Sequence, residues 1–153
     1  MDMTVQEIMT KNPTCCTPET LLDEVARLMV ECDCGAIPIV EDMKNKRPVG
    51  IVTDRDIIIR VLAKGEDCLR KGAEAAMTPT TETIRADANI REAEAIMKEK
   101  QIRRIIVVDD EDTCVGILAQ ADIARHRSDV ETGDVVEEIS EPALMAGSEG
   151  RGQ

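Results

Sequence analysis

Apolar residues along this chain recur with two different periods, which predict helices that alternate with short strands. In the first half, one helical face is formed by apolar residues spaced three and four apart, namely Leu21, Leu22, Val25, Leu28 and Met29. β-branched runs at 37–40 and 48–52 predict two strands, and the turn-forming residues between them predict a hairpin loop. Thr20 is the predicted N-cap of the first helix, and a second helix is predicted from about Asp54 to Ala63.

The same order of elements occurs a second time, so the chain contains two copies of one helix–strand–hairpin–strand–helix unit. Residues 50–57, Gly-Ile-Val-Thr-Asp-Arg-Asp-Ile, correspond to residues 116–123, Gly-Ile-Leu-Ala-Gln-Ala-Asp-Ile. Met9 likewise recurs as Met77. The first copy has the longer hairpin loop, which is where insertions are expected. The last helix of the second copy is predicted from residue 120 to about 127.

Within this repeated segment, the two copies keep an aspartate and differ at the residue three positions before it. Asp56 and Asp122 correspond, whereas Thr53 is replaced by Ala119. A carboxylate at a helix start can accept both hydroxyls of a ribose, and helix N-terminal amides favour a nearby phosphate. Alternatively, Thr53 and Asp56 form a capping box. Because Asp122 persists where Ala119 cannot cap, we favour the ligand-binding interpretation.

Composition limits the partners of the protein. Of the 153 residues 42% are hydrophobic, yet Phe, Tyr and Trp are absent, so the core must be aliphatic and a ring-shaped ligand would lie between aliphatic side chains and backbone. The net charge of −12 disfavours nucleic acid and anionic membranes as partners. The chain has no 18-residue apolar stretch and its N-terminus does not resemble a signal peptide, so we expect a cytoplasmic protein.

A chain this acidic needs local cations to hold the phosphates of a nucleotide. Arg103 and Arg104 precede the central strand of the second copy and are the first candidates. Further candidates are the other basic residues near the repeated segments, Arg55, Arg60, Lys64 and 125–127. Alternatively, Arg103 and Arg104 are solvated or pair with the acidic run 109–112, which we interpret as a hairpin loop rather than a metal site.

Six cysteines and a single histidine raise the question of metal, redox or catalytic chemistry. The spacing of Cys32 and Cys34 is not usual for zinc, and without an export signal disulfides are not the first expectation. Cys16 and Cys34 occupy the positions at which the second copy has Ile84 and Ile102, which favours core positions for both. The competing hypothesis is a redox or metal sensor that uses Cys15, Cys16, Cys32 and Cys34. Because no nucleophile–base spacing surrounds His126, we do not expect an enzyme.

These segments together resemble the cystathionine-β-synthase (CBS) domain. The first copy carries Ile-Met-Thr at 8–10 and Gly-Ala-Ile-Pro-Ile-Val at 35–40, followed by the repeated segment. The second carries Ile-Arg-Arg-Ile-Ile-Val-Val-Asp at 102–109 before its own repeated segment. Two such domains in tandem form a CBS pair, or Bateman module. The ending Ala-Asp-Ile-Ala-Arg-His at 121–126 resembles small stand-alone CBS-pair proteins of the hypoxic-response type.

The resemblance spans residues 4–127 and implies an α/β fold of the α+β type. Two βαββα repeats, related by a pseudo-twofold axis, would pack through their sheets. The expected organisation is a first CBS domain, a linker, a second CBS domain and an acidic, partly disordered tail, at 4–63, 64–72, 73–127 and 128–153. Within the tail, Val135, Val136 and Ile139 predict a short amphipathic helix.

The resemblance also implies a ligand and the residues that hold it. CBS pairs bind adenosine compounds, AMP, ADP or ATP and in some members NAD or S-adenosylmethionine, in clefts between the repeats. Carried over to this chain, the ribose contacts fall to Asp56 and Asp122, and the hydroxyl contact falls to Thr53. The adenine would lie at the strand starts, against Cys16, Ile37 and Pro38 in one cleft and against Ile84, Ile105 and Ile106 in the other. Thr53 makes the first cleft the favoured site.

From the sequence we therefore expect a non-catalytic regulatory module that binds an adenosine nucleotide and needs no metal or further cofactor. CBS pairs commonly dimerise through their helices, which implies a homodimer. We expect no catalytic or transport domain attached to this module, so the signal would pass through its conformation, its dimer geometry or a protein effector. A ligand can shift such an equilibrium only by its different affinities for the two states.

Overall fold

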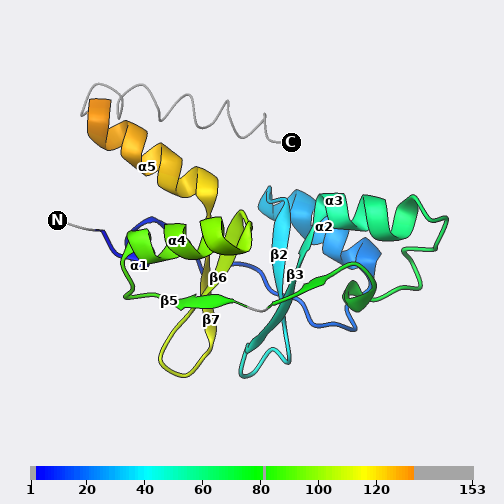
Figure 1. The fold of residues 1–153 in the computed structure, drawn as a ribbon. Helices are drawn as coiled ribbons and strands as arrows, with labels where there is room; N and C mark the ends of the chain where they lie inside the picture. The colour runs from blue at the N-terminus through cyan, green and yellow to red at the C-terminus, as the bar shows by residue number, and fades with distance from the viewer. Residues whose placement is uncertain (1–2, 81, 133–153) are drawn as a thin grey trace.

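The computed structural model of the chain describes residues 3–80 and 82–132, which form two sheets with helices on their outer sides (Figure 1). The first repeat comprises α2, β2, β3, α3 and a π-helical turn η1, at Leu22–Cys32, Ala36–Val40, Pro48–Thr53, Asp54–Ile57 and Ile58–Leu62. The second comprises β5, α4, β6, β7 and α5, at Thr83–Arg85, Ile90–Lys100, Arg104–Val108, Cys114–Ala119 and Gln120–Thr132. The α/β fold class expected from the sequence, two repeats packed through their sheets, is confirmed.

Four short elements lie outside this pattern. Each precedes one repeat in the sequence but packs on or pairs with the other. They are α1, β1, the 3-10 turn η2 and β4, at Val5–Ile8, Thr10–Lys11, Ala73–Ala75 and Thr78–Pro79. β1 precedes the first repeat but pairs with β7 of the second, and β4 precedes the second repeat but pairs with β3 of the first. The sheet orders are therefore β1-β7-β6-β5 and β2-β3-β4. The repeat was predictable from the sequence, whereas this exchange was not.

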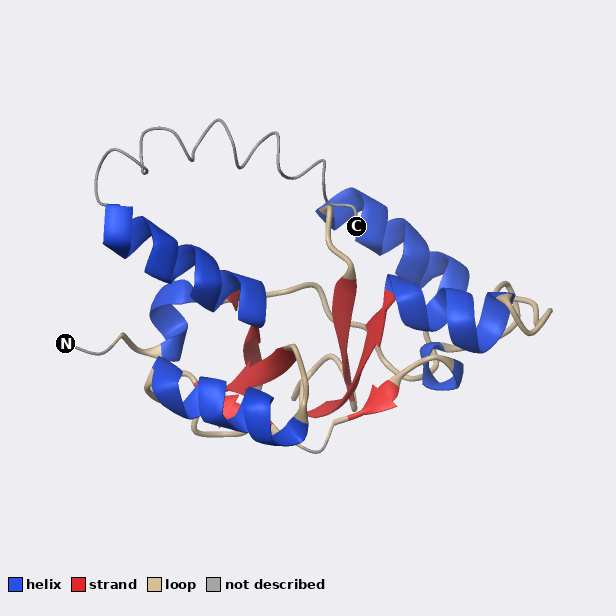
Figure 2. Ribbon diagram, turned by 45° about the horizontal axis from the view of Figure 1, so that its top comes forward, coloured by secondary structure: helices blue, strands red, loops and turns tan. Residues whose placement is uncertain are grey.

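Each repeat has its own aliphatic core, and a smaller cluster joins the two. Val5 of α1 is fully buried in the core of the second repeat, and Ala73 of η2 is fully buried in that of the first. We call the joining group the repeat-interface cluster; it consists of Cys15, Val40, Ile106, Val108 and Cys114. Figure 2 shows the strands of both repeats in the middle of the molecule and the helices around them.

The hairpin loops of the two repeats contact each other at the end of the molecule away from α3 and α5 (Figure 1). The amide of Cys114 donates to the carbonyl oxygen of Lys46 at 2.8 Å, and the Thr113 hydroxyl donates to that of Asn45 at 3.1 Å. The acidic run 109–112 is the second of these loops, as expected, because Asp109 Oδ1 accepts the amides of Glu111 and Thr113.

Two helix boundaries differ from the predictions. Leu21, not Thr20, is the N-cap of α2, because the Thr20 hydroxyl accepts the amide of Thr17 instead, at 3.1 Å. Leu21 is consequently outside the helix and 43% exposed, although it was predicted on the buried face. α5 continues to Thr132, past its predicted end near residue 127.

The rest of the acidic tail, with the helix predicted around Val135, Val136 and Ile139, lies outside the described residues. In the part of the chain that the structure describes, no helix combines the length and the apolar character needed to cross a membrane.

Candidate functional site

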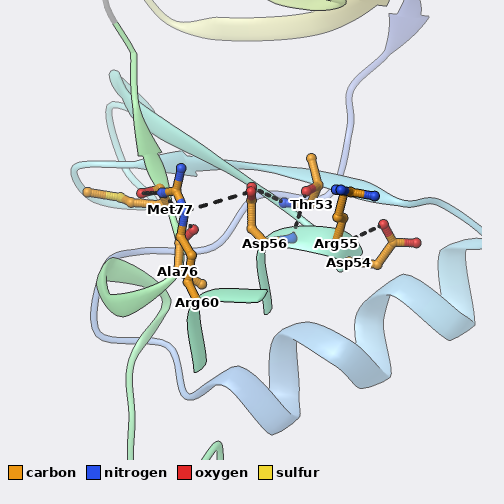
Figure 3. A network of polar contacts seen from close by, with 7 residues as sticks. All are labelled: Thr53, Asp54, Arg55, Asp56, Arg60, Ala76 and Met77. Atoms are coloured by element: carbon orange, nitrogen blue, oxygen red, sulfur yellow. Dashed lines mark hydrogen bonds and ion pairs between the residues drawn. The ribbon is translucent and has the colours of Figure 1, made fainter. Parts of the chain in front are cut away.

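The start of α3, in the first repeat, carries a complete capping box (Figure 3). The Thr53 amide donates to Asp56 Oδ2 at 3.0 Å, and the Asp56 amide donates to the Thr53 hydroxyl oxygen at 3.0 Å. Both side chains therefore satisfy backbone donors that the helix itself cannot pair. The structural alternative considered for Thr53 and Asp56 is realised in the geometry.

Arg60, one helical turn further on, lies beside the second carboxylate oxygen of Asp56. Its Nε is 4.0 Å from Asp56 Oδ1, and its Nη1 donates to the carbonyl oxygen of Met77 at 2.9 Å (Figure 3). The guanidinium therefore ties α3 to the segment that enters β4. Both carboxylate oxygens of Asp56 therefore lie near groups of the protein, one near the Thr53 amide and the other near Arg60.

The start of α5, in the second repeat, carries only the acidic residue of a capping box. Asp122 Oδ2 accepts the amide of Ala119 at 2.9 Å, and Asp122 Oδ1 lies 3.4 Å from Nη1 of Arg125. Asp122 thus stabilises the start of α5 without a hydroxyl partner. The persistence of an aspartate opposite Ala119 has a structural cause, so it does not by itself indicate a ligand, contrary to our reasoning from the sequence.

A cavity of about 320 Å³ lies between the repeats beside Asp122; we call it the inter-repeat cavity. The second repeat contributes residues at the start of β6 and the end of β7 together with the start of α5, namely Arg104, Ile117, Ala119 and Asp122. The other wall comes from the N-terminal segment and from the turn between α2 and β2, namely Thr10, Lys11, Asn12, Pro13, Thr14, Cys32, Cys34, Gly35 and Ala36. Its volume is at the lower end of the range for small-molecule sites.

Two cations and a carboxylate meet in the inter-repeat cavity. Lys11 comes from β1 and Arg104 from the first position of β6, whereas Asp122 lies in the first turn of α5. No carboxylate within residues 3–80 and 82–132 pairs with Arg104 or Lys11. The N-terminus of the 13-residue helix α5 adds a partial positive charge. The cavity therefore offers donors for an anionic group and an acceptor for hydroxyl groups.

Of the two arginines predicted to contact phosphate, the structure brings one to the cavity. Arg104 lines it, and its backbone is in register with Ala119 on β7. Arg103 is exposed, and its carbonyl oxygen accepts the amide of Gln120 at 2.8 Å. Neither arginine forms an ion pair with the acidic run 109–112. Within that run, Asp110 pairs with Arg85.

The aliphatic residues expected to hold adenine lie in the interior. Cys16 and Ile37 belong to the core of the first repeat, and Ile84 and Ile105 belong to that of the second. Pro38 is also buried, and the buried Ile106 belongs to the repeat-interface cluster. Their side chains are not among those that line the inter-repeat cavity. A ligand there would reach these positions only through backbone groups.

The sequence did not point to the N-terminal wall of the cavity. Lys11, Asn12 and Thr14 belong to the segment that crosses to the second repeat, and their role becomes visible only once β1 is seen to pair with β7. The doubled Met-Thr that precedes this segment was the available signal, because it marks where the exchanged strand begins.

Cys32 and Cys34 also line this wall. Cys34, predicted in the core, is half-buried and packs against the core of the first repeat from its edge. Burial raises the pKa of Cys34, and the Cys32 sulfur lies 3.1 Å from the Thr14 hydroxyl oxygen. Among the described residues, no three His, Cys, Asp or Glu side chains are grouped so that they could hold a metal ion.

A family model for the CBS domain matches residues 5–63 and 73–129 of this chain. Hypoxic response protein 1 of Mycobacterium tuberculosis is 36% identical over 143 residues, which cover 94% of this chain and 98% of the relative. A crystal structure of hypoxic response protein I holds two coordinated zinc ions. It superposes with a TM-score of 0.71 at 38% identity, covering 81% of this chain and 98% of that one.

Two further solved structures contain adenosine compounds. The CBS domain pair of protein MJ0100, in complex with 5′-methylthioadenosine and S-adenosyl-L-methionine, is 28% identical with a TM-score of 0.72, over 84% of this chain and 98% of that chain. CBSX2 in complex with AMP is 25% identical with a TM-score of 0.69, also over 84% of this chain and 98% of that chain.

Proposed function

The chain belongs to the CBS-domain family, and from this premise we propose that it is a non-catalytic regulatory module that binds an adenosine nucleotide in the inter-repeat cavity. The observation that carries the proposal is the meeting of Lys11, Arg104 and Asp122 around one cavity, with walls from both repeats. The AMP and S-adenosyl-L-methionine complexes of related CBS pairs support the ligand class.

In this proposal, each charged group has its own part of the ligand. Asp122 Oδ1 accepts one hydrogen bond from Arg125 at 3.4 Å, and a carboxylate oxygen has a further lone pair for the ribose hydroxyls. Arg104 and Lys11 bind the phosphates, because a planar guanidinium and an ammonium both pair well with phosphate oxygens. Asp56 Oδ1 has a comparable contact with Arg60 at 4.0 Å, but Asp56 does not line the inter-repeat cavity, so we propose no ligand at the first motif.

The signal would arise because a ligand in this cavity touches both repeats at once. It would favour the arrangement in which the turn between α2 and β2 of the first repeat, at 34–36, lies close to the sheet that carries Lys11 and Arg104. The receiver of that signal is a second copy of the chain, or a protein effector bound to such a dimer.

A dimer is suggested by an apolar face on the helical side of the first repeat. Ile58, Ile59 and Leu62, which all belong to η1, are 53%, 47% and 59% exposed. Such exposed aliphatic residues on one helical face favour association. We propose that a second copy covers this face through the same residues, as an isologous interface requires.

Titration calorimetry with AMP, ADP, ATP, NAD and S-adenosylmethionine tests the ligand proposal. We expect binding by wild type, and a loss of affinity of about tenfold to a hundredfold in Arg104→Ala, since a charged hydrogen bond contributes about 1.5–3 kcal/mol. Arg103→Ala is the matched control and should bind like wild type. Asp122→Asn should weaken binding, whereas Asp56→Asn should leave it unchanged. Equal losses in the two arginine variants would contradict the proposed site.

A metal sensor is the second candidate, because Cys32 and Cys34 line the same cavity and a relative holds zinc. Metal analysis of the protein as purified, with Cys32→Ala as comparison, separates the two functions. Stoichiometric zinc that disappears in Cys32→Ala, together with no nucleotide binding, would favour the metal sensor.

A further inference from the structure

The fold brings two buried cysteines from different repeats into contact. The sulfur atoms of Cys15 and Cys114 are 4.0 Å apart, although the residues are widely separated in the sequence. Cys15 is 8% exposed and Cys114 is 6% exposed. Both are free thiols, and both belong to the repeat-interface cluster. The pairing is therefore a property of the repeat packing.

The backbone around each cysteine is held by contacts between or within the repeats. The Cys114 amide donates to the carbonyl oxygen of Lys46 in the other repeat at 2.8 Å. On the other side, the Cys16 amide donates to the carbonyl oxygen of Pro38 at 3.1 Å, which fixes the segment that carries Cys15. The two sulfurs would have to approach by about 2 Å to reach a covalent length of about 2.05 Å.

We propose that Cys15 and Cys114 form a redox modification site, at which hydrogen peroxide or another two-electron oxidant of that class joins the two repeats by a reversible disulfide. The site differs from a metal or redox centre at Cys32 and Cys34, because its two sulfurs come from opposite repeats. It also lies in the buried repeat-interface cluster, rather than on the cavity wall.

The chemistry begins at Cys15. The Cys15 thiolate attacks one oxygen of hydrogen peroxide; a sulfur–oxygen bond forms, the oxygen–oxygen bond breaks, and the released hydroxide takes up the proton lost from Cys15 as water. The Cys114 sulfur then attacks the Cys15 sulfur and displaces the hydroxyl group, which leaves as a second water with the proton of Cys114. Two thiols lose two electrons in total, and these reduce the peroxide.

The environment favours Cys15 as the attacking thiolate. Its hydrogen bond with Cys114 lowers the pKa of Cys15, although burial acts in the opposite direction. The pKa of Cys114 is raised, first by its hydrogen bond with Cys15 and then by burial. The pair therefore carries one thiolate in preference to two.

One consequence rests on the proposed function. Asn12, Pro13 and Thr14 line the inter-repeat cavity and run directly into Cys15. A covalent bond to Cys114 would hold this wall at one distance from the second repeat, so oxidation should change nucleotide affinity. The disulfide itself needs no nucleotide, and its formation is measured separately.

The test uses the full chain, reduced, freed of reductant and treated with a small excess of hydrogen peroxide. We expect the titratable thiols to fall by two per chain and to return after treatment with dithiothreitol. Non-reducing peptide mapping after trypsin should join segment 12–27 to segment 105–125. Because Cys15 and Cys16 share one of these segments, the Cys16→Ala variant is mapped in parallel and should retain the cross-link.

The variants Cys15→Ala and Cys114→Ala should each lose the cross-link, and an unchanged circular dichroism spectrum shows that they remain folded. In Cys114→Ala, the Cys15 sulfenic acid should persist long enough to react with dimedone, which gives a readout that does not depend on the cross-link. The proposal is overturned if wild type keeps all its thiols under these conditions. It is also overturned if the two lost thiols map to other cysteines.

Discussion

The sulfur of Met9 occupies the place where a side chain on Gly116 would stand, and Met77 occupies the same place over Gly50. Met9 precedes the first repeat and Gly116 lies in the second, so each contact crosses from one repeat to the other. The doubled methionine and the doubled glycine of the sequence are thus one contact made twice. Glycine at 50 and 116 lets the exchanged segments lie close against β3 and β7.

Alanine at these glycines should destabilise the protein to different extents. At Gly50, a Cβ would lie 2.8 Å from both the Met77 sulfur and the carbonyl oxygen of Thr78 in the paired strand β4. At Gly116, the three nearest atoms all belong to the flexible side chain of Met9. We expect Gly50→Ala to cost about 2–3 kcal/mol and Gly116→Ala about 1 kcal/mol, measured by urea unfolding.

A double-mutant cycle with Met9 checks the cause. Met9→Ala should remove most of the cost of Gly116→Ala, because the new methyl group then has space, giving a favourable coupling of about 0.5–1 kcal/mol. Met77→Ala should rescue Gly50→Ala only in part, since the Thr78 carbonyl oxygen remains. Additive effects at Gly116 would show that the glycine is needed for another reason.

The hydroxyl group that caps α3 can be removed at Thr53 and the equivalent group can be added before α5 at Ala119. Thr53→Ala removes the acceptor of the Asp56 amide and should cost about 1 kcal/mol of unfolding free energy. Ala119→Thr should add the equivalent cap to α5 and stabilise the protein by about 0.5–1 kcal/mol. Thermal unfolding of both variants, with Ala119→Val as the control of equal shape, measures the two effects. A stabilising Ala119→Val would show that capping is not the cause.

The repeated pattern of apolar residues was sufficient to predict the two copies and the order of their elements. Local signals failed where a distant partner decides the structure. Thr20 has the composition of an N-cap, but its hydroxyl bonds to Thr17, and its carbonyl oxygen accepts the amide of Ala73 from the exchanged segment. Spacing within one helix could not reveal that contact.

The candidate site was predictable only in part, because some of its residues are also brought together by contacts between distant segments. The equivalence of Asp56 and Asp122 could be read by aligning the copies, and Arg104 was among the predicted cations. Lys11 and the choice of cleft depend on the packing of one repeat against the other. Sequence comparison favoured the first cleft because it has Thr53, whereas the inter-repeat cavity lies beside Asp122 and supports the second.

A charged residue on the apolar face of η1 should prevent association of two copies. Leu62 is 59% exposed, so Leu62→Glu removes no core packing but would place two like charges in the proposed dimer interface. Light scattering coupled to gel filtration should give a dimer for wild type and a monomer for this variant. Met43 is 51% exposed in the hairpin loop between β2 and β3, at the end of the molecule away from α3, and provides the control Met43→Glu, which should remain dimeric. A wild-type monomer would contradict the interface.

Cys16 should make the protein less stable as the pH rises above about 9. Burial is the main cause that raises its pKa from 9.0 to about 11. The folded state therefore holds the proton more tightly than the unfolded state, so this stabilisation is complete below about pH 9 and is lost as the pH rises towards 11. At ~1.4 kcal/mol per pKa unit, the difference reaches about 2–3 kcal/mol.

Urea unfolding from pH 7 to pH 11 should show a shallower decline for Cys16→Ala than for wild type. Cys68→Ala, in the segment between the repeats, serves as the control, and a decline in Cys16→Ala as steep as that of wild type would rule Cys16 out as the cause.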